Sequence, residues 1–232
     1  MLNKTTKLGF TLAEVLLTLT IIGIIAAMTI PALINNTNKM ENVVALKKAY
    51  STIMQATLML TADYGGDITG IMSGVANNDD FANVFVPKLN VAKICGATNA
   101  NATGCFPNEI YKHLDGTDWN NINTDTAYSK FLINDQMSYA FVFASTSCMS
   151  DQRKALEPVS SPLYSVCGSF YVDINGPNKG PATLGRDLFV FYVTKKGIYP
   201  VGAYPDMWNS DCLPTGGGGC ANKVLLEGAM NY

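Results

Sequence analysis

The chain has 232 residues, a formal net charge of −2 and a pI near 5.3, which argue against a strongly basic nucleic-acid-binding surface. Only 15% of the residues are charged and 48% are hydrophobic. The length allows one globular domain of ordinary size beyond an N-terminal apolar segment.

The most informative segment is an apolar stretch near the N-terminus that has one acid at its start. A short polar leader ends at Gly9, a helix-forming stretch opens at Phe10, and Glu14 follows. Residues 15–38 contain no charged side chain, and as a helix they would reach about 36 Å. That length can cross a hydrocarbon core of about 30 Å. An acid at the mouth of such a segment is costly in lipid, so we expect Glu14 to have a function.

This pattern resembles the N-terminus of type IV pilins and of the pseudopilins of type II secretion systems. The resemblance implies that a membrane prepilin peptidase cuts between Gly9 and Phe10, and that the new amine of Phe10 is methylated. It places the family's glutamate on Glu14 and its helix-softening proline on Pro31. The resemblance in residue motifs covers the N-terminal segment alone.

Two simpler interpretations explain the segment less well. A secretory signal peptide has an apolar core of about 7–15 residues and a small-residue cleavage site, whereas here the core is longer and the best such site, at residues 25–27, is poor. An ordinary single-pass anchor would also be oriented by Lys4 and Lys7 with its N-terminus inside. Neither interpretation explains why Glu14 is tolerated.

The resemblance also implies a division of the chain and a mode of assembly. The parts are a leader over residues 1–9, a transmembrane and assembly half of the helix over 10–37, and a globular domain over 38–232. In a filament, the amine of Phe10 of a neighbouring subunit would lie against Glu14, where a low dielectric strengthens their attraction. The alternative is that Glu14 reaches the cytoplasmic headgroups.

Residues 38–64 continue the helix in amphipathic form. Apolar positions recur at spacings of three and four and predict one buried stripe, made of Val43, Leu46, Tyr50, Ile53, Thr57, Leu60 and Tyr64. Gly65 and Gly66 predict the helix end, because glycine adopts the left-handed conformation at little cost. Pro31 removes one intrahelical hydrogen bond, so we expect a kink or local melting over residues 25–31.

The rest of the chain predicts an antiparallel sheet. Residues 67–135 look irregular, with short helices expected over 81–86 and 107–114, whereas strand patterns cover 137–144, 167–174, 188–194 and 198–201. We therefore expect about four strands packed on the C-terminal half of the long helix. This is an α+β layout of helix on sheet, and it is also the fold of pilins.

Six cysteines lie beyond the membrane segment and predict three disulfides in an oxidising compartment. They are Cys95, Cys105, Cys148, Cys167, Cys212 and Cys220. Six cysteines allow 15 connectivities, among which we favour pairing between sequence neighbours because each pair then closes a short loop. A zinc site is poorly supported, since there is no C-x-x-C and the lone histidine, His113, is far from any cysteine pair.

Residues 173–187 are the best candidate for a metal site in the globular part. Asp173, Asn175 and Asp187 could supply oxygen ligands to calcium, and some pseudopilins hold calcium in a loop near their sheet. The spacing lacks the complete EF-hand pattern, and the same residue types build ordinary turns, so a structural turn is the alternative. No other cofactor is expected.

The sequence does not predict an enzyme. It contains no nucleophile elbow, metalloprotease, P-loop or dinucleotide-binding motif, and we interpret His113 as a surface residue of a helix. No nucleic-acid partner and no small-molecule substrate are expected.

The favoured function is a structural subunit of a type II secretion pseudopilus. Its partners would be like and unlike pilin-like subunits, the prepilin peptidase and an inner-membrane assembly platform. We expect a single pass through a bacterial inner membrane, with the N-terminus cytoplasmic and the domain periplasmic or extracellular. The alternative is a type IV pilin of a surface filament for adhesion or DNA uptake.

Overall fold

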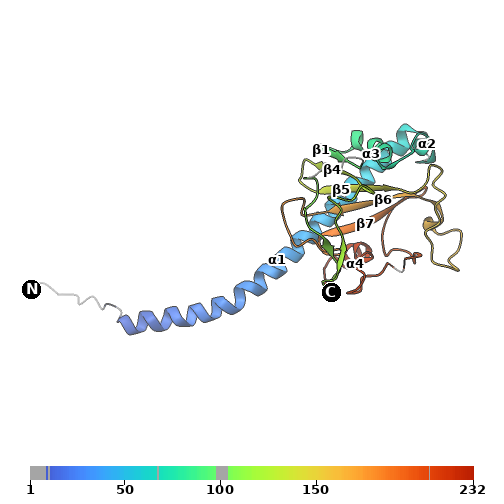
Figure 1. Cartoon of the computed structure of the whole chain (residues 1–232). Helices are drawn as coiled ribbons and strands as arrows, with labels where there is room; N and C mark the ends of the chain where they lie inside the picture. Colours follow the sequence, from blue (N-terminus) through green and yellow to red (C-terminus); the bar gives the residue numbers. More distant parts are fainter. Residues whose placement is uncertain (1–8, 10, 67, 98–103, 209) are drawn as a thin grey trace, which may run out of the picture. The chain divides into compact units, whose positions relative to one another are not determined.

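The computed structural model describes residues 9, 11–66, 68–97, 104–208 and 210–232. The chain divides into two compact units, Met1–Glu41 and Asn42–Tyr232. Helix α1 (Leu12–Asp63) supplies the described helical part of the first unit and continues into the second (Figure 1). The helix is unbroken through Pro31, so the local melting expected around this proline is not seen.

The second part of α1 buries one side in the core of the second unit. Val43, Leu46, Ile53 and Leu60 are at most 5% exposed, which confirms the predicted stripe at these positions. Ala49 and Ala56 complete it, because small side chains on the same face allow close packing. Tyr64 was expected in the stripe but is 56% exposed, because α1 ends at Asp63.

The helix ends where the sequence predicts. Gly65 and Gly66 both have left-handed φ values, +77° and +94°. The N–H of Gly66 donates to the carbonyl of Thr61 at 2.7 Å and closes the last turn. Three short helical pieces follow, which are α2 (Ile68–Met72), α3 (Asn78–Phe85) and the 3-10 turn η1 (Val86–Lys88). Helix α3 overlaps the helix expected over residues 81–86.

The sheet has six strands, all antiparallel, in the order β1-β4-β5-β6-β7-β8. The strands are β1 (Val91–Gly96), β4 (Ser129–Ile133), β5 (Ser138–Phe143), β6 (Val166–Asp173), β7 (Leu188–Thr194) and β8 (Gly197–Pro200). The four strands predicted from sequence are β5 to β8, and the α+β class is confirmed. Strands β1 and β4 add to them from the region expected to be irregular.

A buried lysine explains why the sequence analysis did not predict β4. Lys130 lies in β4 yet is 1% exposed, because its ammonium donates to the carbonyls of Asn123 and Asp125 at 3.0 Å. A buried lysine breaks the apolar alternation by which strands are recognised. The helix expected over residues 107–114 was wrong, since Tyr111–Lys112 forms β2 and pairs with β3 (Asp118–Asn120).

The six-stranded sheet is covered on both faces. One face packs on α1, α3 and α4 (Cys220–Glu227) through a cluster that includes Phe81, Phe141 and Phe170, with the last two ring centroids 4.1 Å apart. The other face lies under residues of the connecting segments and of β2 and β3. Strand β7 is therefore buried at every position.

Three disulfides brace the connecting segments, and each joins neighbours in the sequence. They are Cys95–Cys105, Cys148–Cys167 and Cys212–Cys220. The second links the segment after β5 to β6, its antiparallel neighbour. The third links the segment after β8 to the first residue of α4.

Candidate functional site

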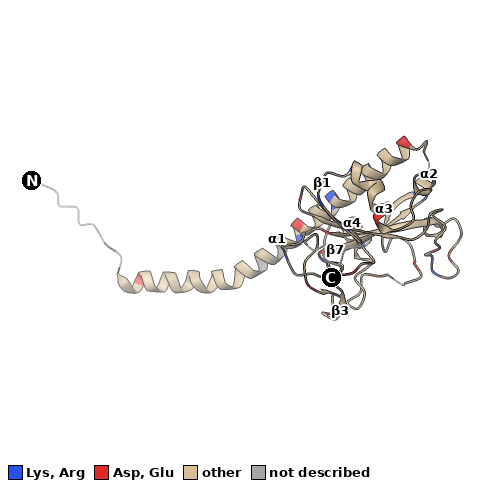
Figure 2. Cartoon of the chain, turned by 45° about the horizontal axis from the view of Figure 1, so that its top comes forward, with Lys and Arg blue, Asp and Glu red and all other residues tan. Residues whose placement is uncertain are grey.

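The first candidate site is the apolar stem, which we define as residues Leu12–Pro31 of α1. These 20 residues form one helix that is long and apolar enough to cross a membrane, and none of the stretch is buried inside the chain. The side chains of Leu17, Ile22 and Met28 are 61–75% exposed. Figure 2 shows that charged residues are almost lacking along this part of the helix. No residue in the described part of the chain buries this surface.

The one acid of the stem, Glu14, closes the first turn of the helix. The N–H and the hydroxyl of Thr11 both donate to Glu14 Oε2 at 2.8 Å, and the Glu14 N–H donates to the Thr11 hydroxyl at 3.3 Å. This reciprocal arrangement is a capping box, for which Thr-x-x-Glu is the sequence signature. Sequence reasoning missed Thr11, although the signature stands in residues 11–14.

The predicted processing site lies directly before this turn. Gly9 is exposed, and a Cβ built on it would meet no atom within 4 Å. Packing within the chain therefore does not require glycine here. Phe10, Lys4 and Lys7 lie outside the described residues, so the predicted cut and methylation stay predictions.

The hydroxyl groups of the stem are satisfied within the helix. Thr18, Thr20 and Thr29 donate to backbone carbonyls three or four residues earlier, at 2.8–2.9 Å. Such back-bonding leaves no hydroxyl that needs water, which suits a helix in an apolar medium. Pro31 lies inside α1 without an N–H of its own, so the carbonyl one turn earlier lacks its usual donor.

The second candidate site is the cluster predicted as a calcium site, at the neck of the β6–β7 hairpin. Asp173 and Asp187 are each 1% exposed, and the Asn175 amide donates to Asp187 Oδ1 at 2.9 Å. Asp173 Oδ1 accepts the N–H groups of Asn175 and Gly176, at 2.8 and 2.9 Å, and Asp173 Oδ2 accepts the Tyr111 hydroxyl. The structure thus brings the three predicted residues together.

Burial dominates the electrostatics of this cluster. Desolvation, reinforced by the charge of Asp173, raises the pKa of Asp187 to about 8. Burial likewise raises the pKa of Asp173 to about 7, although its hydrogen bonds oppose the rise. Asp187 Oδ2 is buried and has no hydrogen-bond partner among the residues that the structure describes. Because a buried unpaired anion is costly, we infer that Asp187 carries a proton at neutral pH.

The hydrogen bonds of the cluster compete with calcium. Calcium takes six to eight oxygen ligands, whereas three of the four carboxylate oxygens here already accept hydrogen bonds. Within the described part of the chain, no three His, Cys, Asp or Glu residues are placed to hold a metal ion. The arrangement is that of a turn, and calcium binding would require it to rearrange.

The turn also depends on one glycine. Gly176 has a φ of +74°, and a Cβ at this position would lie 1.9 Å from the carbonyl oxygen of Gln136. Only glycine allows this approach between the hairpin neck and the β4–β5 turn. The cluster is therefore built into the fold rather than attached to its surface.

His113 lies in the segment after β2 and not on a helix, which corrects the sequence expectation. Its Nδ1 is 2.7 Å from the carbonyl oxygen of Gly216, more than 100 residues later in the chain. Hydrogen bonding between distant segments gives His113 a positioning role that its sequence context does not indicate.

Together, these features define a class of protein: an apolar, acid-capped helix able to span a membrane, continuous with a disulfide-braced α+β domain. Residues 4–30 match the family model of the prokaryotic N-terminal methylation motif, the signature of type IV pilins and pseudopilins. Residues 4–30 of the chain carry this signature. No curated protein matches the chain, and no solved structure matches it.

Proposed function

We propose that the chain is a structural subunit of a type II secretion pseudopilus. In this proposal it is inserted in a bacterial inner membrane, cut after Gly9, methylated on Phe10 and assembled into a periplasmic filament that drives protein secretion. The observation that carries the proposal is the stem, which has no buried side chain and whose one acid lies in the first turn. Its role is structural, and no catalysis is required of it.

The two parts of the chain suit different surroundings. The stem needs lipid or neighbouring stems, because exposed apolar area is unfavourable in water. The domain contains three disulfides, and such bonds persist in oxidising compartments such as the periplasm. A single pass with the N-terminus in the cytoplasm satisfies both requirements.

The geometry of Glu14 adds a step to the proposed assembly. In the single chain its carboxylate caps the helix through Thr11. In a filament, the amine of a neighbouring Phe10 would add a charged donor to a carboxylate already fixed in position by the cap. A fixed acceptor loses less side-chain entropy on pairing, so the cap favours docking in one register.

The acidic pI supports a secretion role over DNA capture. Deletion of the gene distinguishes a pseudopilus from a surface pilus: we expect loss of protein secretion without loss of surface filaments. Loss of surface filaments with normal secretion would instead identify a type IV pilin of a surface filament.

Processing and assembly are tested separately. Mass spectrometry of the mature chain should show a first residue Phe10 that carries one methyl group. Glu14→Gln should insert in the membrane at the normal level but fail to enter filaments, whereas Glu41→Gln, an exposed acid of the same helix, should assemble normally. A chain that starts at Met1, or Glu14→Gln filaments at the normal level, would contradict the proposal.

A further inference from the structure

The globular domain contains a cleft on the face of the sheet opposite α1. The cleft has a volume of about 550 Å³, within the usual range of about 300–1,000 Å³ for small-molecule sites. Strands β5, β6 and β7 form its floor, and the segments around residues 113–119, 152, 208 and 210–218 form its walls. All of these belong to the second unit.

The hollow results from the order of side chains across the strands. Val142, Ser169 and Tyr192 lie side by side on β5, β6 and β7, because Ser169 pairs with both of the others. Side chains alternate between the two faces of a strand, and the neighbouring Phe141, Phe170 and Phe191 belong to the core on the opposite face. The small serine between two larger residues leaves a depression in the floor.

Rare side chains gather around this depression. The chain has two tryptophans and one histidine, and all three line the cleft although they come from separate segments. Trp119 stacks on Tyr171, with ring centroids 6.0 Å apart and planes inclined by 21°. Trp208 is 69% exposed. An aromatic ring held at the mouth of a cleft provides a flat apolar surface for a ligand.

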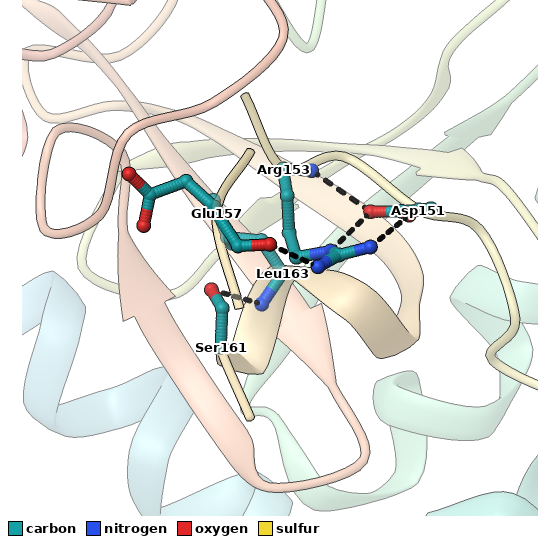
Figure 3. Close-up of polar contacts among 5 residues, drawn as sticks. All are labelled: Asp151, Arg153, Glu157, Ser161 and Leu163. Atoms are coloured by element: carbon teal, nitrogen blue, oxygen red, sulfur yellow. Dashed lines mark hydrogen bonds and ion pairs between the residues drawn. The ribbon is translucent and has the colours of Figure 1, made fainter. Parts of the chain in front are cut away.

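The rim that carries Trp208 is ordered by hydrogen bonds. The indole Nε1 donates to Gln152 Oε1 at 3.0 Å, and the N–H of Met207 donates to the carbonyl of Gln152 at 2.9 Å. The adjacent Arg153 fixes this segment, because its Nε and Nη2 donate to the two carboxylate oxygens of Asp151 at 2.9 and 2.8 Å (Figure 3).

Further contacts of Arg153 extend this support. Nη1 donates to the carbonyl of Glu157, and the guanidinium lies 4.7 Å from the ring centroid of Tyr164. Ser161 Oγ accepts the N–H of Leu163 in the same loop (Figure 3). The exposed indole is thus held in position before any ligand arrives, which lowers the entropy cost of binding.

The polar groups of the cleft are uncharged. No Lys, Arg, Asp or Glu is found among the described residues that line it, so a charged ligand would be desolvated without an ionic partner. Ser169 Oγ has no hydrogen-bond partner among the described residues, and His113 uses Nδ1 for the Gly216 carbonyl, which leaves Nε2 for a ligand. A purely apolar ligand would bury these groups unpaired.

We infer that this cleft binds a neutral saccharide. A sugar ring has an apolar C–H face that can stack on Trp208 or Trp119, and hydroxyl groups that can pair with Ser169, His113 and Gln152. It therefore satisfies both the aromatic walls and the uncharged polar groups, which neither an apolar nor an ionic ligand does. This site is separate from the stem and adds a binding activity to a structural subunit.

Tryptophan fluorescence can test the inference, because both tryptophans of the chain report on this cleft. The full chain is placed in phosphatidylcholine bilayer discs, since sugar-based detergents would supply the ligand chemistry under test. Methyl glycosides of glucose, galactose and N-acetylglucosamine, and their oligosaccharides, are then titrated. We expect saturable changes in the emission with at least one neutral saccharide and none with glucuronic acid, and no thermal shift with indole, whose own fluorescence rules out the emission readout.

Three variants make the result specific. Trp208→Ala should weaken saccharide binding about tenfold or more, and its binding is measured by the thermal shift on saccharide addition. Ser169→Ala should also weaken binding, because it removes the hydroxyl without adding bulk. Tyr64→Ala, at another exposed aromatic, should bind as the unmodified chain does. The inference is overturned if no neutral saccharide binds, if indole or an aromatic peptide binds instead, or if Trp208→Ala binds normally.

Discussion

The stem and the globular domain use the same apolar residue types and treat them in opposite ways. Leu17 and Ile22 of the stem are 62% and 61% exposed, whereas Leu46 and Ile53, further along the same helix, are fully buried. The residue types are the same, and the difference is whether another part of the chain packs against them. The sheet of the domain covers the second part of the helix, whereas the stem has no buried residue and, in the proposed function, packs against lipid or other subunits.

Removal of the stem tests this difference between the stem and the domain most directly. We expect a chain that begins at Met40 to lose membrane association completely and to keep its folded domain, because the domain core begins at Val43. Membrane fractionation and far- and near-UV circular dichroism measure the two effects. Unfolding of the shortened chain would show that the domain depends on the stem.

Removal of a disulfide tests how far the domain stabilises itself. Replacing Cys148 and Cys167 by serine should lower the free energy of unfolding by about 2–5 kcal/mol, because the bridge restricts the unfolded chain. Guanidinium unfolding of the oxidised variant measures the loss. The stem should be unaffected, so membrane insertion serves as the control, and unchanged stability would mean that the bridge contributes nothing.

The buried carboxylates predict a pH dependence of the domain alone. Burial raises the pKa of Asp187 to about 8 in the folded state, above the value of about 3.9 in an unfolded chain. The folded state therefore binds more protons between these values, and stability falls by about a few kcal/mol as pH rises from 4 to 8. Asp187→Asn should reduce this fall in unfolding experiments, and the part due to Asp173, whose pKa is raised to about 7, should remain.

The control for this pH prediction is Asp118→Asn, which changes an exposed carboxylate. It should keep the pH dependence of the unmodified chain. Stability that rises with pH in the unmodified chain would show that Asp187 is ionised and paired in the folded state.

The calcium prediction has a separate test at the same cluster. Binding to the folded state alone would raise the melting temperature with calcium concentration, and Asp187→Asn would remove that rise. No rise in the unmodified chain would leave the turn as the only role of Asp173, Asn175 and Asp187.

The smallest expected effect concerns the first turn of the stem. Thr11→Ala removes the capping hydroxyl and should cost the helix end about 1 kcal/mol. Faster hydrogen exchange of the amides of residues 12–15 in bilayer discs would measure it. Exchange in the domain should not change, and equal exchange in the first turn would show that Thr11 does not act as a cap.

Local signals predicted much of this fold because they depend on residues close in the sequence. Gly65 and Gly66 indicated the end of α1, and the continuous run of aromatic and β-branched residues over 188–194 indicated β7. The apolar spacing of Val43, Leu46 and Ile53 predicted the buried side of the helix. Pairing between sequence neighbours likewise described the three disulfides.

Other features required contacts that no local pattern reveals. The sequence did not predict β4, because Lys130 interrupts its apolar pattern. The Lys130 ammonium is buried in the fold by hydrogen bonds to carbonyls of the preceding loop. The cleft depends on the register of three strands, which places Ser169 between Val142 and Tyr192. Its two tryptophans and its histidine lie in segments that the sequence gives no reason to associate.

The sequence by itself determined the stem, because an apolar helix long enough to span a bilayer, with one acid in its first turn, is defined by composition and order alone. The tertiary structure determined the cleft on the face of the sheet opposite α1, where residues far apart in the chain lie close together. Membrane affinity is a sum over one segment, whereas a binding cleft depends on the relative positions of many segments. Membrane affinity can therefore be predicted from the sequence of one segment, whereas the cleft forms only when the chain folds.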